Sequence, residues 1–366
     1  MIPWYTPYFG GKEKAYVMQA LDSTWISDGE FVQRMESELR EILDTPCAIT
    51  TSNGTTSLML AYITLDLKPS DEVIVPAFSF AAPANMAITM GAKPVYVDVD
   101  PDTWLMCPNA VKAAISERTK LIVPVHSYGN VCEMEAICDI AEKHSIAVLE
   151  DTAEALFSTY HGKQAGTVGD IGSFSFQATK TITTGEGGAI CINHGDIEAL
   201  EGAARLYRSH GMQGKKRYWH EVAGHNFRLT NMQAAMGCAQ LEAREDIIEN
   251  KNRVYARYKV HLESQPGLTM QAITTGCAPV MWAISVALDL EAFPARDIVI
   301  ETLREMHGID TRPGFYAFSD MPPYDAPECL NSNRLSNTVI SLPSSTLLSD
   351  EDIDRICEVL ILLRRT

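Results

Sequence analysis

Between residues 46 and about 195, short runs of apolar and β-branched residues alternate with stretches of helical length. Four such runs lie at 72–76, 94–98, 121–125 and 146–150. Within each run the apolar residues are continuous, which is typical of parallel strands that helices cover on both faces. The stretch 132–144, between two of the runs, places apolar residues at helical spacing. The alternation predicts an α/β fold with a mostly parallel, mixed sheet between helices.

The character of the sequence changes near residue 245. Beyond it we expect a charged helix at 247–262, a loop at 266–280, and two helices at 298–307 and 350–363. Ser349 and Asp352 have the spacing of a capping box at the start of the last helix. We therefore predict a large domain over 1–245 and a smaller C-terminal α+β domain over 246–366.

The balance of charged residues argues against some partners. Lys and Arg number 30, Asp and Glu number 47, and the formal net charge is −17. A surface this acidic disfavours nucleic acid and anionic membranes as binding partners. No stretch reaches the roughly 18 apolar residues that a spanning helix needs, and the first residues lack the pattern of a signal peptide. We expect a cytoplasmic protein.

The nine cysteines are scattered along the chain. Their number is odd, and no CxxC pair occurs that would begin a zinc site. We expect free thiols in a reducing compartment, with neither a disulfide framework nor a bound metal.

A cluster of small hydroxyl residues precedes a helical run at 51–57. Helix N-termini leave backbone N–H groups free and carry the positive end of the helix dipole, so they bind phosphate. Gly54, Thr55 and Thr56 are the candidate phosphate-binding residues of this cluster. The alternative interpretation is a plain N-cap that holds no ligand.

Two further residues have the surroundings of reactive groups. Asp151 directly follows the apolar run at 146–150, and ligands of open α/β sheets bind at the carboxyl ends of strands. It could meet a cationic nitrogen there or simply cap the next turn.

Lys180 lies between an aromatic run and a Gly/Thr-rich loop, with no acidic residue within five positions. A partly desolvated lysine acts as a nucleophile, whereas a lone lysine is more often solvated surface.

Taken together, a phosphate-binding helix N-terminus, a carboxylate for a pyridinium nitrogen and a Schiff-base lysine are what a pyridoxal phosphate (PLP) enzyme requires. Their order along the chain resembles that of fold-type I aminotransferases. Specific motifs make the whole chain similar to the DegT/DnrJ/EryC1/StrS family of sugar aminotransferases. These motifs lie at 52–56, 73–80, 91–94, 124–129, 150–155, 173–188, 224–235, 311–313 and 342–344. The resemblance implies a fold-type I large domain followed by a small C-terminal domain.

The resemblance also implies how the cofactor is held. Lys180 would bind PLP covalently and then move the proton between the amino donor and the cofactor. Asp151 would pair with the protonated pyridine nitrogen, so that the ring stays an electron sink. Phe80 would stack on the ring face, and Glu154 would lie near the 3-hydroxyl group of the ring.

A second group of residues would hold the phosphate of the cofactor. Within one subunit these residues are Thr55, Thr56 and Ser175, with Gly54 at the same helix N-terminus. Asn226 would reach the phosphate of the neighbouring subunit's cofactor. The active site would therefore be composite, and the protein would be an obligatory homodimer.

The family's activity implies the substrates. We expect transamination of a nucleotide-linked keto sugar, a 4-keto-6-deoxyhexose on GDP or UDP, with glutamate as the amino donor. The retained Lys180 favours transamination over dehydration, because family dehydratases carry His at that position. The candidate substrate contacts are His126, Arg228, Arg312 and Tyr316. His126 could instead be a satisfied structural group, and Arg228 could brace the subunit interface instead of binding an anion.

Three alternative functions remain at this point. A cyclitol-ketone aminotransferase of the same family would bind no nucleotide. A non-catalytic scaffold would have lost Lys180, Asp151 or the phosphate site, all of which are present. A nucleotide-dependent dehydrogenase would carry a Gly-x-Gly-x-x-Gly turn after its first strand, and no such turn follows an expected strand here.

Overall fold

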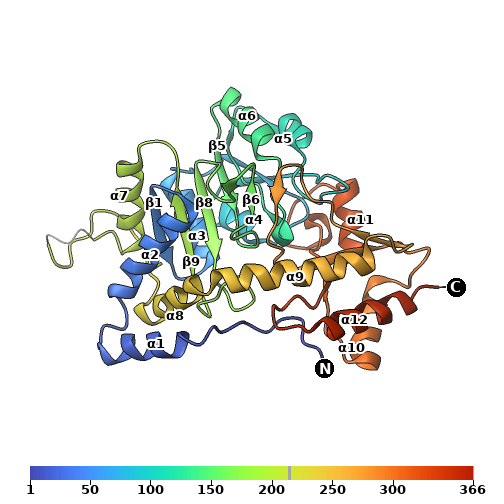
Figure 1. Ribbon diagram of the computed structural model, residues 1–366. Helices are drawn as coiled ribbons and strands as arrows, with labels where there is room; N and C mark the ends of the chain where they lie inside the picture. The colour runs from blue at the N-terminus through green and yellow to red at the C-terminus, as the bar shows by residue number, and fades with distance from the viewer. Residues whose placement is uncertain (213–215, 366) are drawn as a thin grey trace.

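The computed structural model describes residues 1–212 and 216–365 and is built around a seven-stranded sheet. Helices surround this sheet, as Figure 1 shows. The strands, in spatial order, are β1 (Cys47–Thr51), β9 (Gly188–Ile192), β8 (Ile171–Ser175), β5 (Ala147–Asp151), β4 (Thr119–Ile122), β2 (Glu72–Pro76) and β3 (Lys93–Val97). The five strands from β8 to β3 are parallel, and β9 runs antiparallel to both β8 and β1. The predicted α/β fold with a mostly parallel, mixed sheet is confirmed.

All four runs that the sequence singled out are strands, with bounds that shift by up to three residues. The largest shift is at β4, which ends at Ile122 although the apolar run continues to Val125. Pro124 lacks an N–H group, so the ladder cannot continue through it. Val125 still makes an isolated parallel bridge to Asp151, which keeps the ends of β4 and β5 side by side.

Helices cover both faces of this sheet, as continuous apolar strands require. On one face lie α3 (Gly54–Thr64), α4 (Ala82–Thr89) and α7 (Ile197–Arg208). On the other face lie α2 (Glu30–Leu43) and α8 (Asn231–Glu242) at the β1 end, and α5 (Pro108–Ala114) and α6 (Met134–His144) at the β3 end. The first helix, α1 (Glu13–Asp22), packs on α8. Neighbouring strand residues alternate between the two cores: Val73 and Val75 join one, Ile74 the other.

A second, antiparallel sheet follows in the C-terminal third of the chain. Its strands are β10 (Leu268–Met270), β12 (Ile284–Leu288), β14 (Val339–Leu342) and β13 (Arg312–Pro313). Its helices are α9 (Arg244–Leu262), α10 (Arg296–His307), α11 (Leu330–Thr338) and α12 (Asp350–Leu362). The three predicted C-terminal helices are confirmed as α9, α10 and α12, and Ser349 caps α12 by accepting the Asp352 N–H at 3.1 Å.

The expectation of a continuous loop over 266–280 is wrong in two places. Residues 268–270 form β10, and Cys277–Ala278 forms β11. The strand β11 pairs with β6 (Thr159–Tyr160), which in turn pairs with β7 (Lys163–Gln164). Strands this short show no measurable alternation, so tertiary pairing, not local pattern, decides them.

Residues of the predicted large and small domains pack together in one apolar cluster. One apolar cluster contains Phe78 and Trp104 from the first half together with Val286 and Leu342 from the second. The predicted division at residue 245 falls in the first turn of α9, the long helix that crosses the molecule in Figure 1. The division into two domains stays a prediction.

The first residues of the chain are held by its C-terminal part. Ile2 makes a parallel bridge to Ile309, and its N–H donates to the Gly308 carbonyl at 2.7 Å. The Trp4 indole N–H donates to Ser341 Oγ at 3.2 Å. The N-terminus consequently lies beside α10 and α12 (Figure 1).

Three observations concern the described ranges as a whole. No helix in residues 1–212 or 216–365 is long and apolar enough to cross a membrane. Over the same ranges no group of His, Cys, Asp and Glu side chains could hold a metal ion. All nine cysteines, which fall within the described residues, are unpaired.

A carboxylate at the end of β3 joins the two halves. Asp98 accepts the backbone N–H groups of Asn331 and Ser332 at 3.0 and 2.9 Å, and the Ser332 hydroxyl at 2.7 Å. These residues form the first turn of α11, where the helix dipole favours a negative charge. One side chain of the large sheet therefore fixes the start of a helix in the second half.

We predict that Asp98→Ala lowers the free energy of unfolding by about 2 kcal/mol, because three donors at a helix start lose their acceptor. Urea unfolding followed by circular dichroism measures the change. Glu301→Ala, on the exposed face of α10, is the matched control and should change stability by less than about 0.5 kcal/mol. Equal effects of the two substitutions would contradict the assignment of Asp98.

Candidate active site

A cavity of about 690 Å³ lies at the carboxyl ends of β5 and β8. Ligands of open α/β sheets bind in this position. The residues that line it are Trp4, Asn53, Gly54, Thr55, Thr56, Leu58, Phe80, Ala82, Val125, Asp151, Ala153, Glu154, Ser175, Gln177, Thr179, Lys180, Glu186, Trp282 and Phe315. The sequence analysis assigned eight residues of this subunit to the cofactor site, and all eight line the cavity. They are Gly54, Thr55, Thr56, Phe80, Asp151, Glu154, Ser175 and Lys180.

The N-terminus of α3 forms one wall of the cavity. Asn53 is its N-cap: the side-chain carbonyl accepts the Thr56 N–H at 2.8 Å, and Thr56 Oγ1 accepts the Asn53 N–H at 3.1 Å. Gly54 is required here, because a Cβ atom would lie 2.8 Å from Ser175 Cβ. The helix start is thereby pressed against the end of β8. Helix N-termini in this position attract anions.

Lys180 lines the same cavity and lies in the loop that follows β8. Its Nζ atom is 3.3 Å from Glu154 Oε1 and 4.0 Å from the centre of the Trp282 ring. Its backbone carbonyl accepts the Tyr5 hydroxyl at 2.8 Å. The side chain is 15% exposed, so the amine faces the cavity and not bulk solvent.

Asp151 and Glu154 bring two buried carboxylates to the same cavity. Burial raises the pKa of Asp151 to about 6, and its Oδ1 accepts the Ala153 N–H at 3.1 Å. A carboxylate held in this way is stabilised by a cation placed against it. Glu154 Oε2 accepts the Tyr128 N–H at 2.8 Å, which leaves Oε1 for Lys180. Tyr128 has a φ of +66°, a strained conformation that aims its N–H at the carboxylate.

Phe80 is 61% exposed although its ring lines the cavity. An aromatic side chain of this size usually buries most of its surface. The uncovered ring is therefore available to stack on a planar ligand that enters the cavity.

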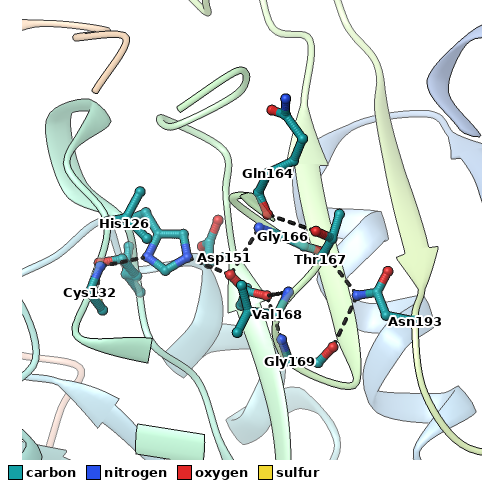
Figure 2. Close-up of polar contacts among 12 residues, drawn as sticks. His126, Cys132, Asp151, Gln164, Gly166, Thr167, Val168, Gly169 and Asn193 are labelled. Carbon is teal, nitrogen blue, oxygen red and sulfur yellow. Dashed lines mark hydrogen bonds and ion pairs between the residues drawn. The ribbon is translucent and has the colours of Figure 1, made fainter. Parts of the chain in front are cut away.

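His126 is the one candidate that the structure removes from the substrate. Its side chain has no exposure, and it lies in a buried network outside the cavity wall (Figure 2). Nε2 lies 2.9 Å from Glu150 Oε2, and Nδ1 accepts the Cys132 N–H at 3.2 Å. Because Nδ1 accepts, Nε2 carries the proton and donates to Glu150. The prediction of a substrate contact is wrong, and His126 is the satisfied structural group of the alternative.

The remaining predicted residues lie outside the cavity wall. Asn226 is exposed and Arg228 half-buried, in a segment whose Phe227 carbonyl accepts the Ser52 N–H at 2.8 Å. Arg312 pairs with Asp310 at 2.8 Å. In these positions the side chains of Asn226, Arg228 and Arg312 do not contact Lys180.

Tyr316 also lies outside the cavity wall, and its hydroxyl lies 3.2 Å from the Arg296 guanidinium. Its neighbour Phe315 lines the cavity in its place. The role of Asn226 at the phosphate of a neighbour's cofactor and the substrate roles of Arg228, Arg312 and Tyr316 stay predictions.

Two aromatic residues of the cavity, Trp4 and Trp282, escaped the sequence analysis, and each comes from a segment far from the motifs in sequence. Phe315 also lines the cavity, two residues after the motif at 311–313. Trp4 and Trp282 meet edge to face, with ring centres 5.6 Å apart. No local signal could have found them, because their position depends on how the second half packs on the first.

Comparisons with known proteins bear on this site. The model of the DegT/DnrJ/EryC1/StrS aminotransferase family matches residues 7–361. The chain is 38% identical over 360 residues to GDP-perosamine synthase of Caulobacter vibrioides, a match that covers 97% of this chain and 96% of that relative. It is also 38% identical over 364 residues to GDP-perosamine synthase of Escherichia coli O157:H7, covering 98% and 97% of the two chains.

A solved structure supports the same grouping. The PLP form of the putative sugar aminotransferase Spr1654 from Streptococcus pneumoniae matches with a TM-score of 0.93 at 27% identity. The match covers 99% of this chain and 98% of that one.

The raised pKa of Asp151 yields a prediction about stability. Above about pH 6 the folded protein must bury the ionised carboxylate, whereas below the unfolded pKa of about 3.8 both states bind the proton. Asp151→Asn removes the charge and keeps an oxygen for the Ala153 N–H. In the cofactor-free protein it should raise the free energy of unfolding near pH 8 by about 2 kcal/mol, with little change near pH 4.

Urea titrations of both proteins at the two pH values measure the difference. A less stable Asp151→Asn protein near pH 8 would contradict the claim that the carboxylate is buried without a cation.

Proposed function

Because the chain belongs to the DegT/DnrJ/EryC1/StrS aminotransferase family, we propose that it transfers the amino group of glutamate to a GDP-linked 4-keto-6-deoxyhexose. The observation that carries this proposal is the convergence of Lys180, Asp151 and the N-terminus of α3 on one cavity. The three groups come from different segments of the chain, so their meeting is a property of the fold and not of one motif.

The protein is a PLP-dependent aminotransferase. When bound, PLP supplies an aldehyde that takes up amino groups and a ring that accepts electrons from the substrate carbon. The cavity fits this cofactor in three ways. Asp151 is a buried carboxylate that a pyridinium cation would stabilise, Gly54 leaves no side chain between α3 and Ser175, and Phe80 presents an uncovered ring.

Lys180 performs the central step in this proposal. Its side chain is 15% exposed with Nζ beside Glu154, and this amine would hold the cofactor and move the proton at the substrate carbon. Glu154 accepts the Lys180 ammonium in a hydrogen bond of 3.3 Å, which keeps the amine directed into the cavity. The Tyr128 N–H in turn keeps Glu154 from rotating away.

Asp151 and the phosphate site orient the cofactor. The ionised Asp151 would hold the proton on the ring nitrogen, since burial makes an unpaired carboxylate costly and a paired one favourable. The N–H groups at the start of α3, together with the Thr55, Thr56 and Ser175 side chains, would bind the phosphate. These residues would thereby orient the cofactor toward Lys180.

The second phosphate contact comes from another subunit in this proposal. Asn226 is exposed and outside the wall of its own cavity, which is where a residue that serves a neighbour has to lie. Since the site is completed by a second chain, the protein works as a homodimer with two composite sites.

The choice of substrate rests on the relatives and on the cavity wall. Two relatives at 38% identity are GDP-perosamine synthases, which favours a GDP-linked sugar over a cyclitol ketone. Trp4, Trp282 and Phe315 form an apolar aromatic surface that suits the methyl group of a deoxy sugar. Glutamate as the donor follows from the family resemblance.

The absorption spectrum tests both half-reactions. With PLP bound, we expect a band near about 410–430 nm that moves to about 330 nm when glutamate is added. A GDP-linked 4-keto-6-deoxyhexose should restore the first band, whereas a cyclitol ketone should not. Restoration by the cyclitol ketone alone would contradict the proposed substrate.

Lys180→Ala should abolish the band near about 410–430 nm and lower turnover by at least about 10³-fold, because the amine that binds PLP and moves the proton is gone. Lys163→Ala removes an exposed lysine in β7 and is the matched control. Full activity of Lys180→Ala would overturn the assignment of this residue.

Subunit mixing tests the composite site. Lys180→Ala and Asn226→Ala homodimers should each be impaired, because every site contains one lesion. A mixed dimer contains one site with both lesions and one site with none. Mixing after mild dissociation should therefore restore activity, up to about half of the wild-type value per mixed dimer. Activity that stays at the sum of the two homodimers would mean that Asn226 serves its own subunit or none.

A further inference from the structure

A buried lysine in α9 has no part in the chemistry proposed above. Lys251 is 1% exposed, and its Nζ atom donates to two backbone carbonyls, those of Trp282 and Ser344, each at 2.8 Å. One lysine thus joins α9 to the segment before β12 and to the segment after β14. Both partners are neutral carbonyl oxygens.

Burying an amine in this way is costly for the fold. Removing an ammonium group from water disfavours its charged form, and burial lowers the pKa of Lys251 to about 7. The neutral amine still has two N–H groups, so both carbonyl bonds persist when the proton leaves. An apolar side chain of similar length would avoid the cost of burying the amine, but it would leave both carbonyls without this donor. The site is therefore better explained by what the two bonds hold in place.

The first bond holds the residue that covers Lys180. The Trp282 ring lies 4.0 Å from Lys180 Nζ, a distance at which the ring face attracts an ammonium. The indole N–H of Trp282 donates to the Thr179 carbonyl at 2.5 Å. Trp282 consequently touches Lys180 through its ring and through the adjacent peptide, while Lys251 fixes its backbone.

A second contact leads from Lys251 to Lys180 by a separate segment. The Lys251 Nζ atom is 5.1 Å from the centre of the Tyr5 ring. The Tyr5 hydroxyl donates to the Lys180 carbonyl at 2.8 Å. Lys251 therefore contacts both aromatic residues that support Lys180, one from the N-terminus of the chain and one from its C-terminal half.

We propose that Lys251 is a positioning residue, which fixes the backbone of Trp282 and thereby holds the Trp282 ring against Lys180. The inference rests on the proposed role of Lys180, and it adds a group outside the cavity wall to the machinery. Lys251 touches neither cofactor nor substrate, and it acts through Trp282.

The test measures the chemical reactivity of Lys180 in the cofactor-free protein. Acetic anhydride is added, and peptide mass spectrometry gives the rate at which Lys180 is acetylated. Lys251→Met removes both carbonyl bonds and fills the same volume. Freed from its anchor, the Trp282 ring no longer covers the amine or favours its charged form, so acetylation should be about fivefold faster.

The matched control is Arg253→Met, two residues along the same helix. Arg253 also donates to a backbone carbonyl, that of Leu348 at 2.6 Å, but on the α12 side of α9. It should lower stability without changing the acetylation of Lys180. An equal acceleration in the two variants would show a general loosening of α9 and would overturn the proposal.

A double substitution tests whether Lys251 acts on Lys180 through Trp282. Trp282→Ala alone should accelerate acetylation at least as much as Lys251→Met, and the double variant should add nothing further. Additive effects would mean that Lys251 acts by another route. Lys251→Gln, which keeps N–H donors on a shorter side chain, should accelerate acetylation less, and it replaces Lys251→Met if that variant does not fold.

The holoenzyme supplies an independent measurement. Lys251→Met should lower kcat about tenfold while the KM for the keto sugar stays within about twofold, because Lys180 is misdirected while the sugar contacts remain. An unchanged kcat overturns the proposal. If the proposed function is wrong, the result is different: Lys180→Ala then shows a normal PLP band. The acetylation experiment uses the cofactor-free protein and does not depend on the proposed function.

Discussion

The buried carboxylate of Glu150 is the interaction on which the geometry of the cavity depends. It accepts His126 Nε2 at 2.9 Å and the backbone N–H groups of Gly166, Val168 and Gly169 at 2.9, 2.7 and 2.7 Å. A fully buried carboxylate is stable only with such a complete set of donors. The bonds tie the last residues of β5 to the segment after β4 and to the loop before β8 (Figure 2). The next residue along the chain is Asp151, so its position follows from this network.

The fold treats the adjacent carboxylates of Glu150 and Asp151 differently. Glu150 has several donors, which hold its pKa low in spite of burial. Asp151, one residue later, has a single backbone donor, and burial raises its pKa. Adjacent residues of a strand point to opposite faces, so one carboxylate enters a structural network and the other enters the cavity. The fold thus stabilises one carboxylate by itself and leaves the other dependent on a ligand.

The sequence predicted the parts of the site that one short segment can supply. The strand ends and the helix start are local features, so Asp151, Lys180 and Gly54 could be placed at one end of a parallel sheet. The aromatic wall could not be predicted, because Trp4 and Trp282 reach the cavity only through the packing of both chain ends. His126 was wrongly interpreted, since neighbours in sequence do not tell whether a histidine faces a cavity or a buried glutamate.

The secondary structure shows the same difference between local features and contacts that depend on distant segments. Long periodic segments such as α9 and α12 were predicted within a few residues, whereas β10 and β11 were missed. A helix of many residues repeats its pattern over several turns, and a strand of two or three residues does not. What the sequence could not supply is pairing between distant segments, which is also what completes the cavity.

The anchoring of the first residues has a consequence for how the chain is made. Ile2 pairs with Ile309, and Trp4 binds Ser341 while lining the cavity. A ribosome releases the N-terminus first and adds about 5–20 residues each second. The first residues must therefore wait, unpaired, until nearly the whole chain has emerged. The cavity therefore cannot be complete before these C-terminal segments have emerged, and a nascent chain that has folded its large sheet still has no complete active site.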